Sequence, residues 1–247
     1  QLQWIVNAYL LPLSALLLLG GALGDRFGRR KILIAGIALF AIGSALCGLA
    51  DSLNLLLAAR GLQGIGAALL LPNSLAILGS TFSGEGRGRA IGTWSAVSAI
   101  AAAIGPVLGG WLIDTIGWRF IFFINLPVAL AGIAMALVYV RDPVRGADGM
   151  PLDFLGAAFA TIALAALTWG LTIGSGHSGW TMMAMSAVAI GAVLSAAFLW
   201  IERRRGDEAM TPLSVFGSQS FVGLTLLTLL LYGALGGLLV LVPYILI

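Results

Sequence analysis

Long apolar runs, separated by short charged segments, recur through the whole 247-residue sequence. Each run is about as long as the 20 residues that an α-helix needs to cross the hydrocarbon layer of a bilayer, or longer. We expect spans at residues 4–23, 32–50, 53–81, 90–116, 118–140, 154–174, 181–201 and 221–247. Closed barrels are the other structure that can span a bilayer, but the alternating strands that they require are absent from the sequence. The sequence therefore predicts an all-α polytopic membrane protein.

The composition separates this chain from soluble proteins. Hydrophobic residues make up 60% of it and charged residues only 9%, whereas a soluble domain carries about 25% charged residues. The net charge of +3 does not indicate nucleic-acid binding, because the basic residues lie in short segments beside the spans. We therefore expect a lipid bilayer, and no nucleic acid, as the partner of this surface.

The sequence shows none of the patterns that mark a metal site, a phosphate-binding loop or a catalytic nucleophile with its base. Its single cysteine, Cys47, lies within an apolar run, so no disulfide can form within the chain. We therefore predict no enzyme activity, no metal site and no cofactor.

The basic residues give the expected orientation in the membrane. Of the 13 Lys and Arg residues, eleven lie in segments that follow the first, third, fifth and seventh spans, or just inside those spans' ends. Because cytoplasmic loops are enriched in Lys and Arg, these segments are expected in the cytoplasm and the first residue outside. We predict a multi-pass protein of the inner (cytoplasmic) membrane. The sequence starts without Met and its last run reaches Ile247, so we interpret it as an internal piece, preceded by one further helix.

Arg60 lies deeper in an expected span than any other charged residue. It follows the outer end of that span by about two helical turns, and an arginine at such depth costs at least about 2.5–3.5 kcal/mol on insertion scales. Its partners are either carbonyls, water and amides such as Gln63, or a carboxylate outside this sequence. Two interpretations stay open, a structural residue that locks helices together and a residue that takes part in ion or proton coupling.

Small residues mark two places where helices can approach closely. Gly61, Gly64 and Gly66 surround Arg60 and permit contact with a neighbouring helix. The next span contains "AIGPVLGGWL", whose proline removes one backbone hydrogen bond and bends the helix. The residues of this bend are Gly105, Pro106, Gly109 and Gly110. The run is either an ordinary packing surface or a pivot and seal between two states of a carrier.

Polar and aromatic side chains within the spans are candidates for lining a substrate cavity. Amides are costly to expose to lipid, so those within the spans are expected to face protein or a cavity. The candidate substrate-binding residues are Asn7, Tyr9, Gln63, Asn73 and Trp94.

Three motifs together resemble the major facilitator superfamily, and specifically its drug:proton antiporters. The stretch "GALGDRFGRRK" resembles the signature of the cytoplasmic loop between helices 2 and 3, and "LAARGLQGIGAA" resembles the helix 4 signature. The stretch "GPVLGG" resembles the helix 5 antiporter signature, whose leading glycine is replaced here by Ala101. The segment "GWRFIFFINLP" is similar to the start of helix 6 in the branch with fourteen spans.

The resemblance covers the whole chain and implies that it runs from helix 2 into helix 9. The implied fold is an N-terminal six-helix bundle without its helix 1, two additional spans, and the start of a C-terminal bundle. The corresponding units are residues 1–140, 141–205 and 206–247. The resemblance also implies that helix 1 carries the acidic residue that titrates near Arg60.

By the same resemblance, the charged loop acts as a cytoplasmic latch. Asp25 is implied to hold the two bundle halves together by accepting hydrogen bonds from a helix N-terminus of the other half. The residues of this expected latch are Gly21, Asp25, Arg26, Gly28, Arg29 and Arg30.

These observations predict a proton-coupled secondary transporter that exports amphipathic, often cationic drugs or toxic compounds by alternating access, with Arg60 in proton coupling. Its partners are expected to be a drug-like small molecule, protons and the bilayer, and we expect a monomer. One alternative keeps the fold but exports a specific metabolite, siderophore or antibiotic. A second alternative is a membrane receptor or scaffold that transports nothing.

Overall fold

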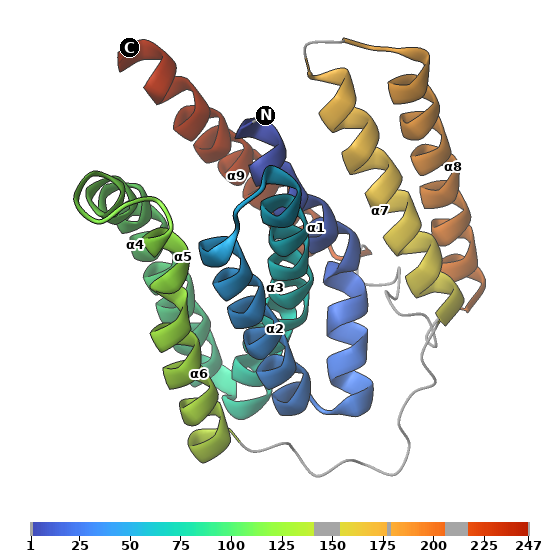
Figure 1. Cartoon of the computed structure of the whole chain (residues 1–247). Coiled ribbons are helices and arrows are strands. Elements are labelled where there is room, and N and C mark those ends of the chain that lie inside the picture. Colours follow the sequence, from blue (N-terminus) through green and yellow to red (C-terminus); the bar gives the residue numbers. More distant parts are fainter. Residues whose placement is uncertain (1, 141–153, 177–178, 206–216, 247) are drawn as a thin grey trace. The chain divides into compact units, whose positions relative to one another are not determined.

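The computed structural model describes residues 2–140, 154–176, 179–205 and 217–246, and all regular elements in these ranges are helices (Figure 1). The helices are α1 (Leu2–Phe27), α2 (Arg29–Leu49), α3 (Leu53–Thr81), α4 (Gly84–Thr115), α5 (Phe120–Phe123), α6 (Asn125–Tyr139), α7 (Phe154–Gly174), α8 (Met182–Arg205) and α9 (Gln219–Leu246). Within the described ranges, seven helices are long and apolar enough to cross a membrane, with α5 and α6 taken together as one. The predicted all-α membrane fold is confirmed.

The chain divides into two compact units, residues 1–198 and 199–247. The predicted boundaries at residues 141 and 206 lie outside the described residues, so the division into 1–140, 141–205 and 206–247 stays a prediction. The eighth expected span corresponds to α9, in which the described stretch Gln219–Leu231 is apolar.

The first turn of the chain is shorter than the sequence predicted. The charged segment after the first span was expected to be a loop, but α1 continues through Asp25 and Arg26, and α2 starts at Arg29. Only Gly28 lies between the two helices, with φ of 105°, a conformation that L side chains rarely adopt. Glycine therefore allows two helices to meet across one residue, and it places the charged side chains on the helix ends.

Three other boundaries also differ from expectation. The seventh span was expected to end at residue 201, but α8 continues to Arg205. The fourth span was expected to start at residue 90, but α4 begins at Gly84 and includes Arg87 and Arg89. The fifth span is divided at Ile124 into α5 and α6. Pro127, near the start of α6, has no N–H to donate to a carbonyl of the preceding turn, which weakens the helical ladder at this point.

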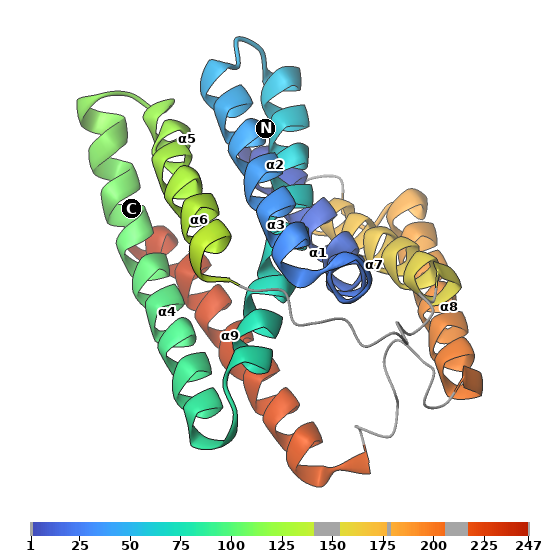
Figure 2. The ribbon, with the colours of Figure 1, turned by 90° about the horizontal axis from the view of Figure 1, so that it is seen from below.

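Helix α3 lies between α1 and α2, and glycines allow all three backbones to approach (Figure 2). A Cβ added to Gly36 of α2 would lie 2.8 Å from the backbone nitrogen of Leu70, and one added to Gly43 would lie 3.0 Å from Ala59 O. On the other side of α3, a Cβ on Gly64 would meet Tyr9 and Pro12 of α1. The predicted close approach around Arg60 is therefore confirmed for both neighbours of α3.

Helix α3 begins where the sequence predicted. Ser52 adopts an extended backbone conformation at the N-cap, and its Oγ accepts a hydrogen bond of 3.3 Å from the N–H of Leu55. Further along the first unit, α7 contacts α1. The rings of Trp4 and Trp169 lie 5.4 Å apart, and the hydroxyls of Ser14 and Thr168 are separated by 3.4 Å.

Candidate functional site

Arg60 lies on α3 about two turns after the Ser52 N-cap. Its Nε donates to the carbonyl oxygen of Ile5 on α1 at 3.1 Å, and its Nη1 donates to Oε1 of Gln63 at 2.9 Å. The centre of its guanidinium group lies 4.5 Å from the ring centroid of Tyr9 and 6.0 Å from that of Phe122. The cation is therefore enclosed by side chains and backbone from α1, α3 and α5.

The partners of Arg60 in the described part of the chain are a carbonyl, an amide and aromatic faces. No carboxylate in that part forms a salt bridge with it; the ion pair seen there joins Asp25 to Arg29. The contact with Gln63, one of the two alternatives that the sequence left open, is present. A guanidinium group over aromatic rings is stabilised by the electrons of the ring faces, and this contribution grows when water is excluded. Arg60 can therefore remain charged and ordered while keeping donors available for an anionic partner.

A buried hydrogen-bond network starts at Gln63. Its Nε2 donates to Ser44 Oγ on α2 at 3.0 Å, and the sulfur of Cys47 lies 3.4 Å from its Oε1. Ser44 donates in turn to the carbonyl oxygen of Phe122 at 2.9 Å, and Nδ2 of Asn125 donates to Ser44 at 3.0 Å. The network joins α3, α2, α5 and α6 through side chains in an apolar environment.

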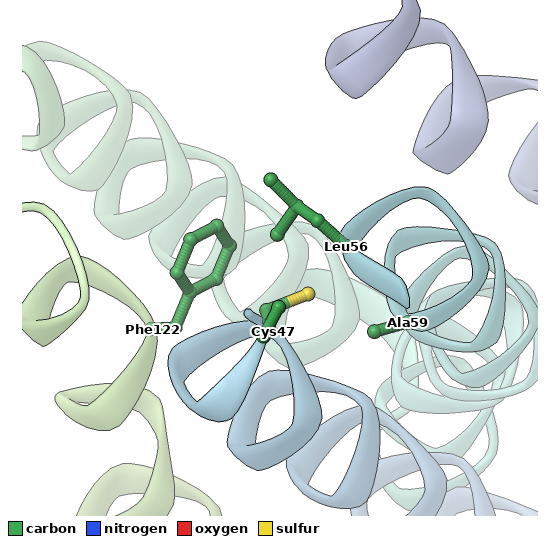
Figure 3. Close-up of a cluster of buried hydrophobic side chains, with 5 residues drawn as sticks. Cys47, Leu56, Ala59 and Phe122 are labelled. Carbon is green, nitrogen blue, oxygen red and sulfur yellow. The ribbon is translucent and has the colours of Figure 1, made fainter. Parts of the chain in front are cut away.

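An apolar cluster packs beside this network. Figure 3 shows Cys47 of α2, Leu56 and Ala59 of α3 and Phe122 of α5 around one point. These side chains are buried, and Phe122 belongs both to the cluster and, through its carbonyl, to the network. Exclusion of water strengthens each of the polar contacts next to the cluster.

The five predicted substrate-binding residues do not gather at one place. Tyr9 and Gln63 contact Arg60, as described above, whereas Asn73 lies ten residues after Gln63, about 15 Å further along the helix. Asn73 is buried between α3 and α1, where its Nδ2 donates to Gly20 O at 2.9 Å and to Leu69 O at 2.7 Å. Asn7 and Trp94 are partly buried, on α1 and α4 respectively.

The residues of the predicted latch join helix ends at the side expected to face the cytoplasm. Arg29 forms a salt bridge of 2.8 Å with Asp25 and also donates to Ala76 O of α3 at 3.0 Å. Arg30 donates to Leu137 O near the end of α6 at 2.6 Å. The guanidinium group of Arg26 lies 5.8 Å from the ring centroid of Phe27. The first turn of α2 therefore connects the ends of α1, α3 and α6.

The glycines of the predicted bend in α4 have open surroundings in the described part of the chain. A Cβ added to Gly105, Gly109 or Gly110 would meet no atom of another element within 4 Å. Pro106 lies inside α4, as expected. The role of this run as a bend and seal stays a prediction.

The comparison with protein families covers the whole chain. The family model of the Major Facilitator Superfamily matches residues 1–247. The chain belongs to this superfamily. The assignment confirms the predicted resemblance to the superfamily, and it establishes a multi-pass membrane protein of a family of transport proteins rather than of enzymes.

Curated relatives within the superfamily are named for resistance and export. The chain is 37% identical over 239 residues to the tetracenomycin C resistance and export protein of Streptomyces glaucescens, covering 96% of this chain and 44% of that protein. It is 35% identical to the methylenomycin A resistance protein of Streptomyces coelicolor, with 96% and 50% covered. It is 29% identical to the multidrug transporter protein MdtP of Bacillus subtilis, with 99% and 45% covered. The chain thus spans about half the length of the curated relatives it matches.

The sequence did not predict two members of the buried network, Ser44 and Asn125. Ser44 is the single hydroxyl residue in the apolar run of α2, and a serine in a helix commonly bonds to a carbonyl of its own helix. Asn125 lies within the "GWRFIFFINLP" segment, and no role was predicted for it. A hydroxyl and an amide within two apolar runs were the available signals, but only the packing of α2 against α5 and α6 brings them together.

Proposed function

We propose that the protein containing this chain is a secondary transporter of the inner membrane that exports amphipathic, often cationic drug-like compounds in exchange for protons. Family membership supports transport, and the names of the relatives, which include drug and antibiotic resistance proteins, support small-molecule export. The observation that carries the proposal is Arg60, a cation within the membrane held by a carbonyl and an amide.

In the proposed mechanism, Arg60 acts on a carboxylate of the full-length protein that lies outside this chain. A neighbouring cation favours the ionised form of a carboxyl group. The carboxylate can then bind either a proton or a cationic substrate, but not both with full affinity. Competition at one site between proton and substrate couples the export of one to the entry of the other.

The remaining parts of the proposal concern the whole protein. We propose a fourteen-span member that functions as a monomer, with the segments after α1, α3, α6 and α8 in the cytoplasm. The distribution of Lys and Arg supports this orientation. The Asp25–Arg29 region is proposed as the cytoplasmic latch, and Gly105, Pro106, Gly109 and Gly110 as the bend and seal.

Substitution of Arg60 in the full-length protein tests the proposal. Arg60→Ala should abolish proton-coupled efflux of a cationic dye, measured as dye uptake into everted membrane vesicles, because the proposed carboxylate loses the cation that favours its ionised form. Arg119→Ala is a matched control, since Arg119 also donates to a backbone carbonyl, Ala50 O at 3.0 Å, and lies against a ring, that of Trp118, at 4.6 Å.

The control variant is expected to retain efflux that an uncoupler abolishes. Normal uncoupler-sensitive efflux by Arg60→Ala, at wild-type abundance in the membrane, would contradict the proposed coupling role.

A second candidate function is export of one specific antibiotic or metabolite. It is favoured by two relatives whose names each refer to a single compound, tetracenomycin C and methylenomycin A. Resistance of cells that express the full-length protein, measured against a panel of unrelated compounds, distinguishes the two. Broad resistance supports the drug exporter, whereas protection against one chemical class supports the specific exporter.

A further inference from the structure

Ser44 lies in the second half of α2 with no exposed surface, and its hydroxyl group contacts three partners. It donates to Phe122 O at 2.9 Å and accepts from Gln63 Nε2 and Asn125 Nδ2, each at 3.0 Å. A hydroxyl group has one hydrogen and two lone pairs. These three contacts therefore use its full bonding capacity.

The directions of these hydrogen bonds are determined by chemistry. The carbonyl oxygen of Phe122 can only accept, so the one hydrogen of the Ser44 hydroxyl points to it. Any amide that contacts Ser44 must then present its NH₂ group. For Gln63 this places the amide oxygen on the opposite side, where Nη1 of Arg60 donates to it at 2.9 Å. A guanidinium group can only donate, so the orientation imposed by Ser44 is also the one that Arg60 requires.

We propose that Ser44 and Asn125 are positioning residues that hold the guanidinium group of Arg60 by fixing the amide of Gln63. The proposal rests on the proposed function, because it concerns the geometry of the coupling residue. Hydrogen bonds run in one direction from Arg60 through Gln63 and Ser44 to Phe122 O. Bonds aligned in this way polarise one another, and a low local dielectric strengthens them further. Removal of the serine hydroxyl frees the amide to rotate and leaves Arg60 with less constraint.

The same contacts connect Arg60 to the junction of α5 and α6. Phe122 is the third residue of α5 and Asn125 the first residue of α6, on either side of the division at Ile124. Asn125 Nδ2 also lies 3.5 Å from Ile121 O. Ser44 thus bonds to both sides of the junction, which anchors the network at a point independent of α3.

Among the described residues, few titratable side chains lie close enough to Arg60 to affect its electrostatic environment. The titratable side chains that face it are Tyr9 from α1 and Cys47 from α2. In the described part of α1, α2, α3, α4 and α5, no carboxylate pairs with it. A change in the pH dependence of transport after substitution of Ser44 would therefore report the position of Arg60 and not the loss of a titrating group.

The test measures dye efflux against pH by the full-length protein in proteoliposomes. Ser44→Ala should lower the efflux rate about fivefold, the effect of one hydrogen bond, and raise the pH of half-maximal efflux by about 0.7 units. The midpoint rises because a displaced Arg60 favours the ionised carboxylate less. Phe40→Leu is the packing control: Phe40 lies one turn before Ser44 on α2, beside Gly66 of α3, and forms no hydrogen bond with Gln63 or Arg60 in the described structure. It should keep the wild-type midpoint.

A double-mutant cycle separates positioning from packing. If Ser44 acts through Gln63, then Ser44→Ala should cause no further shift of the midpoint in a Gln63→Leu background, since the link is already absent. Equal shifts in both backgrounds would overturn the proposal. Asn125→Ala removes the other amide donor and should shift the midpoint in the same direction by a smaller amount. This variant provides the test if Ser44→Ala does not accumulate in the membrane.

The outcomes distinguish this proposal from the proposed function. If Arg60→Ala keeps coupled efflux, the coupling role fails and the positioning role fails with it. If Arg60→Ala loses coupling while Ser44→Ala and Asn125→Ala keep the wild-type rate and midpoint, the positioning role alone is overturned. Both proposals are supported by the following combination of results. Arg60→Ala loses coupling, and Ser44→Ala raises the midpoint in the wild-type background but not in the Gln63→Leu background.

Discussion

Helices α3 and α4 are similar in composition but differ in their surroundings. Both are long and apolar, with mean hydropathies of 1.5 and 1.9, and both contain glycines and one internal proline. In the described structure, 33% of the residues in the apolar stretch of α3 are buried, but only 6% of those in the apolar stretch of α4. The glycines of α3 meet the backbones of α1 and α2, whereas Gly105 and Gly109 of α4 meet no other element within 4 Å.

The difference shows that small residues permit close contact but do not specify it. On α3, the glycines are accompanied by buried side chains that bond across helices, such as Gln63 and Asn73. On α4, the hydroxyls of Thr93 and Ser98 bond to carbonyls of their own helix. Polar contacts between helices, added to the small residues, accompany the tight packing of α3.

Of the substitutions that test this comparison, Gly66→Ala has the largest expected effect on stability. The added Cβ would lie 2.8 Å from Gly36 O and also close to the backbone of Phe40, so two backbones must separate. Such overpacking costs about 1–3 kcal/mol. Thermal unfolding of the full-length protein in detergent should show a lowered Tm.

Gly105→Ala on α4 is the matched control for that substitution. Its Cβ meets no other element in the described structure, and alanine is favoured over glycine within a helix by about 1 kcal/mol. Its Tm should be unchanged or raised. A similar decrease in Tm for both variants would remove the distinction between the two helices.

Gly109→Leu is expected to reduce transport. Among the described residues a Cβ at Gly109 meets no other element within 4 Å, so packing within this chain should tolerate the side chain. Membrane abundance and Tm of the full-length variant are measured beside efflux. As part of the proposed seal, the bulky residue should reduce dye efflux at least about tenfold, which corresponds to 1.4 kcal/mol in the rate-limiting step. Wild-type efflux by this variant would indicate that the open face of α4 has no such role.

The smallest expected effect on stability is that of Asp25→Asn. Asp25 lies near the end of α1 and pairs with Arg29 at the start of α2. In its ion pair with Arg29, Asp25 is exposed and Arg29 is half-buried, and i,i+4 pairs at a protein surface contribute about 0.3–0.5 kcal/mol. The Tm should therefore hardly change. If Asp25 stabilises one transport state, the same energy changes the ratio of states about twofold.

Initial rates of efflux at low and high salt measure the Asp25 effect. The effect should diminish at high salt, because salt screens exposed charges. Equal rates for the variant and the wild type at low salt would argue against a latch that depends on this carboxylate.

Local patterns in the sequence were sufficient for most helix boundaries. The expected spans at residues 53–81 and 154–174 coincide with α3 and α7. Hydropathy determines such segments because each helix satisfies its own backbone hydrogen bonds, and only its length and apolarity need to match the bilayer. The Arg60–Gln63 contact was likewise predictable, since residues three apart lie on one face of a helix.

The errors arose where a boundary depends on geometry rather than on hydropathy. The segment around Gly28 has the charges of a loop, but the helices continue through those charges because a single glycine with positive φ completes the turn. The division of the fifth span at Ile124 depends on the position of Pro127 within a run of uniform hydropathy. Neither feature changes the average polarity of its segment, so a hydropathy pattern cannot detect it.

The sequence by itself determined the class, the position of most spans, and the depth of Arg60 within its span, because these follow from the cost of placing charge and backbone in hydrocarbon. Only the tertiary structure decided which groups surround Arg60. The Ile5 carbonyl and the Tyr9 ring come from α1, and the Ser44 hydroxyl comes from α2. These contacts join residues far apart in the chain, so they depend on which glycine-lined faces pack together.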